Sequence, residues 1–348
     1  MRVLQLGPYP PPYGGVQVNL VAIRRLLLRR GHTCAVANIT RHRRAEGDDI
    51  YYPESAAQLL RLVRRLRYDI LHLHIGGAVP LRLAALAFAC ATAGRGKSVL
   101  TFHSGGYPNS PQGRAARPGS VRGFVFRRFD RIIAVNQQIA EMFARFGVGP
   151  SRVRLIAPHA TPAPPADAAL PPQLRSFFDT HDPVLVTVGL LEPHYDLGLQ
   201  IDALGGVRER FAGAGLVIVG SGSIEEELRR RIAAKPYAEH VLLCGDVPHD
   251  ATLRALAEGD IFLRTTHYDG DAISVREALH AGTPVIATDN GMRPAGVHLI
   301  PVGDRTALVA SVEARLREPR AARDGREGET GEENIAAVLR LYEELLRR

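Results

Sequence analysis

Two carboxylates at the ends of a loop of small residues are the groups in this chain best placed to do chemistry. Asp269 opens the loop, Gly270-Asp271-Ala272-Ile273-Ser274 continues it, and Glu277 follows on a segment with a helical pattern. Such a loop exposes backbone N–H groups at a helix N-terminus, where unpaired donors and the helix dipole stabilise an anion. Glu277, one turn into the helix, would then hold the hydroxyl groups of a ribose or a sugar. The spacing therefore indicates a site for a nucleotide sugar rather than for a bare phosphate.

The same residues also allow a purely structural interpretation. Ser274 and Glu277 have the spacing of a capping box, in which Ser274 is the N-cap and Glu277 reaches back, and this stabilises a helix by about 1 kcal/mol. Taken alone, these residues favour capping. The flanking segments, Phe262 to Thr266 and Gly282 to Ile286, give the order strand, acidic loop, acidic helix, strand. That order favours a ligand site.

Three other loops follow expected strands and carry suitable atoms. Gly14 and Gly15 precede a helix, so backbone amides there can approach a phosphate or a sugar closely. His103 lies directly after a strand, where an imidazole suits hydrogen bonding or proton transfer near neutral pH. The loop Gly220-Ser221-Gly222-Ser223 forms a second capping-box pattern with Glu226, and a well-capped helix is the interpretation we prefer for it.

Short β-branched runs alternate with amphipathic helical stretches along nearly the whole chain. This alternation predicts parallel sheets covered by helices on both faces. The expected strands are Val3 to Leu6, Cys34 to Ile39, Ile70 to His74, Ser98 to Phe102, Ile132 to Val135, Val153 to Ile156, Val184 to Val188, Leu216 to Val219, Val241 to Cys244, Ile261 to Leu263, Val285 to Ala287 and Val297 to Ile300. Ligands of such sheets bind beyond the carboxyl ends of the strands, where all of these loops lie.

A proline-dense stretch from Pro158 to Pro172 interrupts the alternation and is typical of a semi-rigid linker. A chain of 348 residues suits two domains of ordinary size. We therefore expect an α/β protein of two doubly wound domains that face each other across a cleft. The expected parts are a domain over 1–160, a linker over 161–172, a second domain over 173–325 and a C-terminal segment over 326–348.

Positive charge is concentrated in the first half of the chain. Residues 1–160 hold 24 Lys and Arg against 7 Asp and Glu, a net charge of +17, whereas the remainder holds 20 against 29, a net charge of −9. Any single arginine is best explained as part of a solvated helix face, but the summed field attracts anionic partners. Nucleic acid is disfavoured, because no binding motif accompanies the charge and aromatic residues make up only 6%. Anionic lipid head groups, or a lipid-linked phosphate acceptor, fit better.

No apolar stretch approaches the roughly 20 residues that a membrane-spanning helix needs. The chain begins directly with the strand pattern Arg2 to Gly7, so we expect no signal peptide and a cytoplasmic location. Cys34, Cys90 and Cys244 have neither disulfide nor metal-ligand spacing. We expect no metal site.

These segments together resemble the GT-B glycosyltransferases, specifically glycosyltransferase family 4, over almost the whole chain. The segments that carry the resemblance are Gly14-Gly15, His72-Leu73-His74, the His103 loop, Val188-Gly189, Val217 to Gly222, the block from Asp269 to Glu277 and the final helix from Glu333. Their order and spacing are more specific than any one motif. The resemblance implies that the last helix crosses back to the first domain.

The resemblance also implies roles for individual residues. Glu277 would bind the donor ribose, and Asp269, where the family usually has Glu, would contact the donor sugar. The amides of Ala272, Ile273 and Ser274 would hold the diphosphate or the sugar, and His103 would lie beside the reacting centre. The remaining expected donor-binding residues are Gly14, Gly15, Gly189, Gly222, Gly270 and Asp271.

One departure from the family pattern affects the expected mechanism. The family places Arg after the glycine of the first strand of the second domain and Lys a few residues later, where this chain has Leu190 and Tyr195. These cations would offset the charge that develops on a leaving diphosphate. Three explanations are open. Arg264 or Arg293 supplies the positive charge, which is the explanation we favour, or a protonated His194 or His267 supplies it. Alternatively, the protein binds a sugar nucleotide without transferring the sugar efficiently.

We thus expect a retaining, metal-independent glycosyltransferase of the hexosyltransferase type that acts in polysaccharide or glycoconjugate synthesis. It would use a UDP- or GDP-linked sugar, with no cofactor beyond this donor, and a glycan or lipid-linked acceptor held by the basic domain. We expect it to lie peripherally on the inner face of the cell membrane. The alternatives are a catalytically silent nucleotide-sugar-binding protein and a GT-B sugar-nucleotide epimerase. A dehydrogenase is disfavoured, because the first strand is not followed by G-x-G-x-x-G.

Overall fold

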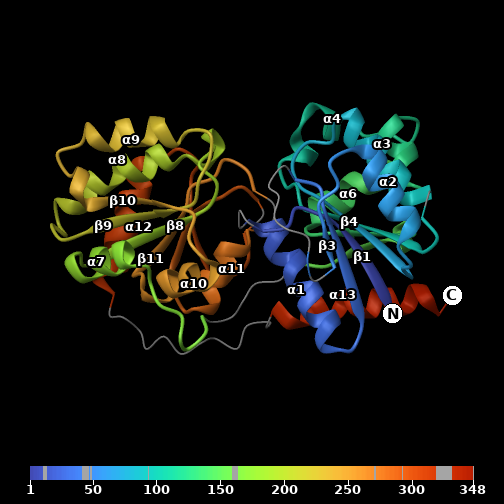
Figure 1. Cartoon of the computed structure of the whole chain (residues 1–348). Helices are drawn as coiled ribbons and strands as arrows, with labels where there is room; N and C mark the ends of the chain where they lie inside the picture. The colour runs from blue at the N-terminus through green and yellow to red at the C-terminus, as the bar shows by residue number, and fades with distance from the viewer. Residues whose placement is uncertain are drawn as a thin grey trace. The chain divides into compact units, whose positions relative to one another are not determined.

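The chain forms two compact units, described from a computed structural model that covers residues 1–10, 14–40, 47, 49–92, 94–158, 164–269, 272–291, 293–318 and 331–347. Unit 1 comprises Met1–His159 together with Gly331–Arg348, and unit 2 comprises Ala160–Thr330. Both are α/β (Figure 1). The final helix therefore belongs to unit 1, although the whole of unit 2 precedes it in sequence.

Unit 1 contains a parallel sheet of seven strands in the order β3-β2-β1-β4-β5-β6-β7. The strands are β1 (Arg2–Gly7), β2 (Thr33–Asn38), β3 (Ile50–Tyr51), β4 (Ile70–Ile75), β5 (Lys97–Phe102), β6 (Arg131–Ala134) and β7 (Val153–Leu155). The central strands are buried on both faces because helices cover both.

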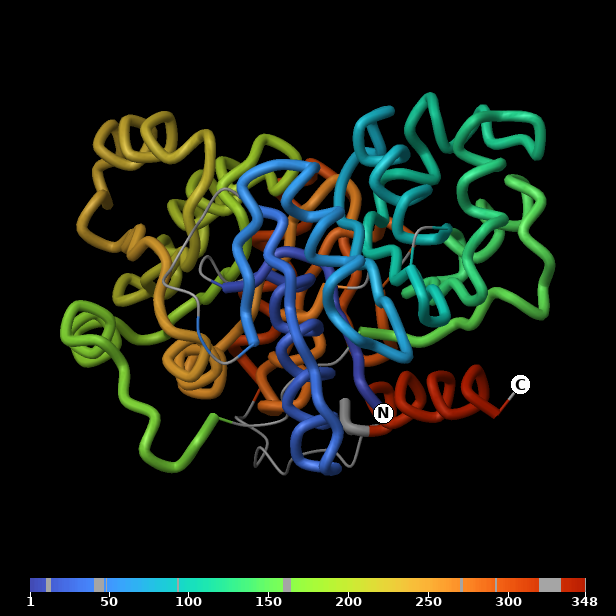
Figure 2. Tube along the Cα trace, turned by 45° about the vertical axis from the view of Figure 1, so that its right-hand side comes forward, coloured from blue at the N-terminus to red at the C-terminus, as the bar shows by residue number. Residues whose placement is uncertain are grey.

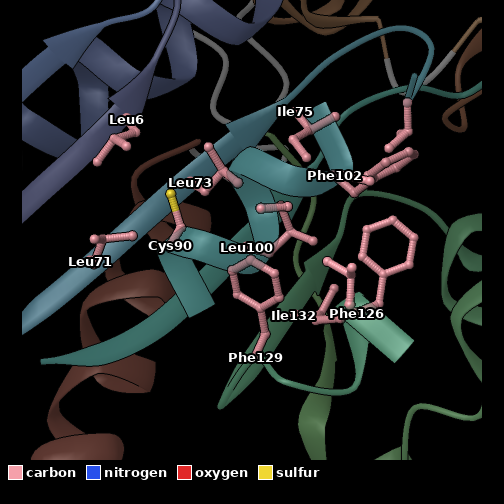
Figure 3. Close-up of a cluster of buried hydrophobic side chains, with 14 of the residues drawn as sticks. Leu6, Leu71, Leu73, Ile75, Cys90, Leu100, Phe102, Phe126, Phe129 and Ile132 are labelled. Carbon is pink, nitrogen blue, oxygen red and sulfur yellow. The ribbon is translucent and has the colours of Figure 1, made fainter. Parts of the chain in front are cut away.

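Alternate residues of these strands face two different helical layers. The helices are α1 (Gly15–Arg29), α2 (Ala56–Arg65), α3 (Leu81–Thr92), α4 (Pro111–Arg114), α5 (Val121–Phe126), α6 (Gln137–Arg145) and α13 (Gly331–Leu346), with short turns η1 (Tyr107–Asn109) and η2 (Pro150–Arg152). Val3 and Ile70 pack with α1 and α13. Leu4 and Leu71 pack on the opposite face with α2, α3, α5 and α6, and part of this second cluster is drawn in Figure 3.

The final helix is fixed to the sheet of unit 1 by a buried hydroxyl group. Tyr342 on α13 is fully buried, and its Oη lies 2.5 Å from Nδ1 of His72 on β4. Nε2 of the same imidazole lies 2.7 Å from Oγ1 of Thr101 on β5. Figure 2 shows α13 beside the N-terminal strand. Both nitrogens of His72 thus have partners, and losing either would leave a buried polar atom unpaired.

Unit 2 contains a parallel sheet of six strands in the order β10-β9-β8-β11-β12-β13. The strands are β8 (Val184–Val188), β9 (Gly215–Val219), β10 (Val241–Gly245), β11 (Ile261–Arg264), β12 (Val285–Thr288) and β13 (Val297–Ile300). The helices are α7 (Pro172–Thr180), α8 (Leu197–Arg208), α9 (Glu225–Ala233), α10 (His249–Glu258), α11 (Ile273–His280) and α12 (Arg305–Arg317), with η3 (Pro193–Tyr195) and η4 (Ala238–His240). One face packs against α8, α9 and α12, and the other against α7, α10 and α11 (Figure 1).

The expected α/β class with two parallel, helix-covered sheets is confirmed, and the twelve expected strands are all present within one or two residues of their expected bounds. The two-residue strand β3 was not expected, because so short a run carries no pattern. The predicted capping box at Ser223 is wrong. Helix α9 begins at Glu225 without a side-chain cap, and acidic residues in its first turn with Arg230 and Arg231 in its last turn complement the helix dipole instead.

Replacing Tyr342 by Phe tests how α13 is held. The change leaves Nδ1 of His72 buried without its partner, so we expect unit 1 to lose about 1–3 kcal/mol of stability. The measurement is the urea midpoint followed by circular dichroism. Tyr68→Phe is the matched control, since the buried Tyr68 hydroxyl has no hydrogen-bond partner among the described residues. Equal midpoints for both variants would contradict the role given to Tyr342.

Candidate functional site

A group of buried charged side chains lies at the carboxyl ends of β11 and β12 in unit 2. Asp269 Oδ2 accepts hydrogen bonds from Arg264 Nε at 2.9 Å, Arg293 Nη1 at 3.1 Å and Thr266 Oγ1 at 3.2 Å. Arg264 Nη2 also lies 2.9 Å from the same oxygen. The two arginine side chains are only 6% and 3% exposed. We call Arg264, Asp269 and Arg293 the arginine–aspartate cluster.

The charges of this cluster hold each other in the ionised state. Burial alone would raise the pKa of the Asp269 carboxyl, but the Arg264 and Arg293 guanidinium groups hold it below its ordinary value. Burial opposes the charge on Arg264, yet attraction to Asp269 raises the pKa of that guanidinium. Breaking a buried pair of this kind by removing one partner typically costs 3–5 kcal/mol.

Arg264 lies beside the strand end at which the sequence lacks its expected cations. Its Nη1 donates to the Val188 carbonyl at 2.8 Å, and its guanidinium stacks over the Tyr195 ring at 4.6 Å. A Cβ atom added to Gly189 would lie 2.3 Å from Tyr195 Cε1 and 2.7 Å from Arg264 Nη1. The Arg264 guanidinium therefore occupies the space next to Gly189, and the Tyr195 ring covers this guanidinium. The Leu190 side chain, by contrast, is 45% exposed.

The Arg264 guanidinium retains N–H donor capacity for a ligand. A guanidinium carries five N–H donors. Asp269 engages Nε and Nη2, the Val188 carbonyl engages Nη1, and the Tyr195 side chain is a further partner, so these described residues leave one of the five donors available. A phosphate could therefore be bound without first breaking the contact with Asp269.

Glu277 pairs with a histidine of the neighbouring helix α10. Its side chain is 3% exposed, and Oε1 lies 2.8 Å from Nε2 of His249, the first residue of α10. Helix α11 begins at Ile273 with Ala272 as N-cap and without a side-chain cap, so Ser274 is not the N-cap and the alternative interpretation of this spacing as a capping box is wrong. His249 was not expected. Only its place after β10, at the carboxyl edge of the sheet, could have indicated it.

The other expected donor residues of unit 2 differ in how they are placed. Ala272 and Ile273 are buried at the start of α11, and Ser274 Oγ lies 3.5 Å from the Val188 carbonyl oxygen. Gly222 packs on backbone, because an added Cβ would lie 2.4 Å from the Leu191 carbonyl oxygen. Ser223, next to it, donates from Oγ to Glu192 at 2.6 Å. Gly270 and Asp271 lie outside the described residues.

Two further histidines line the same edge of unit 2. His194 stacks on Tyr268 with ring centroids 4.7 Å apart, and burial lowers its pKa. His267 Nε2 lies 3.3 Å from the Asp196 carboxylate. Because a lowered pKa disfavours the imidazolium of His194, the structure favours the arginines over His194 as the source of positive charge.

The expected residues of unit 1 lie at the carboxyl ends of β1 and β5. Gly14 is the N-cap of α1, which Gly15 begins. His103 follows β5, and its Nε2 lies 3.3 Å from Nδ1 of His74 on β4. His74 Nε2 in turn lies 3.0 Å from Oε1 of Gln5 on β1. Gln5 was not expected, because inside an apolar strand it gave no functional signal.

The part of the chain that the structure describes contains no group of three or more His, Cys, Asp or Glu side chains able to hold a metal ion. Among the helices searched there, none is long and apolar enough to cross a bilayer.

Two family models match successive parts of the chain. Glycosyltransferase Family 4 matches residues 13–163, and Glycosyl transferases group 1 matches residues 175–319. The first match lies in unit 1 apart from its last few residues, and the second lies within unit 2.

Curated relatives of this chain include mycobacterial mannosyltransferases. The phosphatidyl-myo-inositol mannosyltransferase of Mycobacterium leprae is 30% identical over 258 residues, 72% of this chain, and the match spans 64% of that relative's length. The GDP-mannose-dependent alpha-(1-6)-phosphatidylinositol monomannoside mannosyltransferase of Mycobacterium tuberculosis is 28% identical over 325 residues, covering 84% of this chain and 81% of its own.

Solved structures share the fold at low sequence identity. Anabaena Alr3699/HepE in complex with UDP-glucose has a TM-score of 0.75 at 15% identity, with both chains covered completely. The trehalose-6-phosphate synthase OtsA has a TM-score of 0.73 at 14% identity, covering 100% of this chain and 99% of its own. At such identity the likeness concerns the fold alone.

Gly189→Ala tests the close packing around Arg264. A methyl group there must displace Tyr195 or the guanidinium, so we expect the thermal midpoint of unit 2 to fall by an amount equivalent to about 1–3 kcal/mol. Gly119→Ala is the matched control, because an added Cβ there meets no atom within 4 Å. A midpoint unchanged by Gly189→Ala would show that this packing is not tight.

Proposed function

We propose that the chain, which belongs to the GT-B glycosyltransferases of the family 4, group 1 type, transfers a sugar from a nucleoside diphosphate sugar to a hydroxyl group of a lipid-linked acceptor. The donor site assigned by this proposal is the carboxyl edge of the unit 2 sheet. The observation that carries the assignment is the arginine–aspartate cluster beside Gly189, with Glu277 on the adjacent helix α11.

The chemistry of the leaving group explains why this cluster matters. Cleavage of a sugar–phosphate bond leaves negative charge on the diphosphate, and preorganised cations in a water-poor site stabilise it most. Arg264 reaches the space next to Gly189 from β11, and Arg293 is held close by through Asp269. The two guanidinium groups thus substitute for the cations missing at Leu190 and Tyr195.

Glu277 and Asp269 take different parts in the proposed site. The Glu277 carboxylate pairs with His249 through Oε1, and we assign this carboxylate to the ribose hydroxyl groups of the donor, for which it is a hydrogen-bond acceptor. Asp269 Oδ2 is occupied by the arginines. We assign it first to orienting those cations and second to the donor sugar.

GDP-mannose is the first donor to test. The mycobacterial and corynebacterial relatives at 27–28% identity are named as GDP-mannose-dependent enzymes. The HepE complexes contain UDP, UDP-glucose or UDP with glucose, so UDP-glucose is the second donor to test. Retention of configuration and independence from metal ions remain part of the proposal on the strength of family membership.

Helices α3 and α5 of unit 1 present a surface suited to a lipid acceptor. The segment 70–129 contains no Asp or Glu and eight Lys and Arg. Within it Leu81, Phe88, Val121 and Phe124 are 64%, 37%, 61% and 44% exposed, and the Phe88 and Phe124 rings stack at 5.8 Å. Arg128 lies over the Phe124 ring at 4.6 Å. Apolar side chains among fixed cations are the pattern expected for docking on an anionic bilayer.

Arg264→Leu tests the proposed donor site. We expect kcat for transfer from GDP-mannose to phosphatidylinositol vesicles to fall about 10²–10³-fold, whereas Arg264→Lys, which keeps the charge, loses less. The assay is run with and without EDTA, and NMR of the product gives its anomeric configuration. Arg305→Ala, an exposed cation of unit 2, is the matched control.

The outcomes of this assay separate the alternatives. If Glu277→Ala abolishes turnover while Arg264→Leu and Arg293→Leu leave it unchanged, the role given to the two arginines is wrong. If GDP-mannose and UDP-glucose raise the thermal midpoint but no transfer or hydrolysis follows, the chain is a nucleotide-sugar-binding protein. Failure of both to raise the midpoint would contradict the donor site.

Vesicle co-sedimentation tests the surface on α3 and α5. We expect binding to vesicles rich in anionic lipid at low salt and weaker binding at high salt. Phe88→Ser combined with Phe124→Ser should reduce the affinity at least tenfold, since burying one such ring contributes about 1.5–3 kcal/mol. Leu299→Ser, which changes a comparably exposed apolar residue of unit 2, is the control. Binding indifferent to lipid charge or to the double change would contradict this surface.

A further inference from the structure

A chain of three polar side chains, of which Gln5 and His74 are buried and His103 is half-buried, runs across the unit 1 sheet. Gln5 is on β1, His74 is on the neighbouring strand β4, and His103 follows the next strand, β5. Gln5 Oε1 lies 3.0 Å from His74 Nε2, and His74 Nδ1 lies 3.3 Å from His103 Nε2. Gln5 is fully buried and His74 is 1% exposed.

The orientation of the Gln5 amide is determined by a group that can only accept. Gln5 Nε2 donates to the backbone carbonyl of Leu20 at 3.2 Å and lies 3.2 Å from Sγ of Cys34. A flipped amide would place its oxygen against the Leu20 carbonyl oxygen, with no hydrogen between them. Oε1 therefore faces His74, and His74 must donate to it from Nε2.

The protonation of His74 then determines that of His103. Burial lowers the pKa of both imidazoles, and the nearby His72 ring, 4.1 Å from the His74 ring, lowers that of His74 further. Both rings are thus neutral and carry one N–H each. Since His74 uses its proton at Nε2, its Nδ1 accepts, and His103 must donate from Nε2.

We infer that Gln5 and His74 are positioning residues that hold His103 as its Nε2–H tautomer, so that His103 presents Nδ1 to the substrate as a hydrogen-bond acceptor. Among the described residues, no hydrogen-bond donor reaches this Nδ1. A neutral acceptor at that place suits a hydroxyl group, which can donate, and disfavours a phosphate oxygen, which cannot. His103 then orients a sugar or acceptor hydroxyl and does not supply a proton.

The role as acceptor for a substrate hydroxyl rests on the proposed function, but the tautomer does not. It is therefore measured first, in the ligand-free protein, by NMR of ¹⁵N-labelled histidine side chains, with the His103 signals assigned by their loss in His103→Gln. We expect a protonated Nε2 and an unprotonated Nδ1 on both His74 and His103. A protonated Nδ1 on His103 overturns the inference, whatever the protein binds.

Gln5→Met tests whether Gln5 sets this tautomer. The change removes the acceptor for His74 Nε2–H at similar side-chain length, so the two rings should exchange between tautomers and His103 should show averaged shifts. Gln137→Met, an exposed change on α6, should leave the His103 signals unaltered. If Gln5→Met leaves them unaltered as well, Gln5 is not a positioning residue. Should Gln5→Met not fold, the tautomer of the unaltered protein still decides the inference.

Kinetics connect the tautomer to the reaction. We expect Gln5→Met to lower kcat/KM for the donor or acceptor about tenfold, by an amount close to that of His103→Gln, and to add little to it in the double variant. Full additivity of the two changes would contradict a shared role. A protein that has the expected tautomer but binds no nucleotide sugar would refute the proposed function and leave the tautomer assignment intact.

Discussion

A single carboxylate oxygen between two buried guanidinium groups determines the arrangement of the unit 2 site. Asp269 Oδ2 pairs with both Arg264, the last residue of β11, and Arg293, which follows the adjacent strand β12. Without it, two cations would be buried side by side, a state too costly to persist. The same contact directs Arg264 toward Val188, where Gly189 leaves room and Tyr195 covers the guanidinium. We therefore propose that the shortened acid at Asp269 and the missing cations at Leu190 and Tyr195 are parts of one rearrangement.

Unit 1 uses neutral polar groups for a comparable purpose. Tyr342, His72 and Thr101 hold the final helix on the sheet, while Gln5, His74 and His103 extend from the same strands to the carboxyl edge. Every histidine in these chains lies where burial opposes a charge, so its hydrogen bonds depend on which nitrogen carries the proton. Unit 2 therefore provides guanidinium groups of fixed charge, and unit 1 provides an imidazole held in one tautomer.

The sequence predicted the sheets well because buried parallel strands are apolar on both faces, whereas the helix caps depended on partners far along the chain. Glu277 pairs with His249, and Ser223 donates to Glu192. These residues therefore make tertiary contacts in place of the two capping boxes, and no local spacing reveals such contacts. A cap is worth about 1 kcal/mol, less than the roughly 3–5 kcal/mol lost when a buried charged pair is broken. Arg264 and Arg293 were identified from their strand ends, but their shared contact with Asp269 depends on strand order.

The most direct test is the crystal structure of the protein with GDP, and with UDP, bound. If the arginine–aspartate cluster receives the leaving diphosphate, phosphate oxygens will lie about 3 Å from the guanidinium nitrogens of Arg264 and Arg293, and ribose hydroxyl groups will lie at Glu277. A diphosphate ordered elsewhere, with neither arginine in contact with it, would contradict the account.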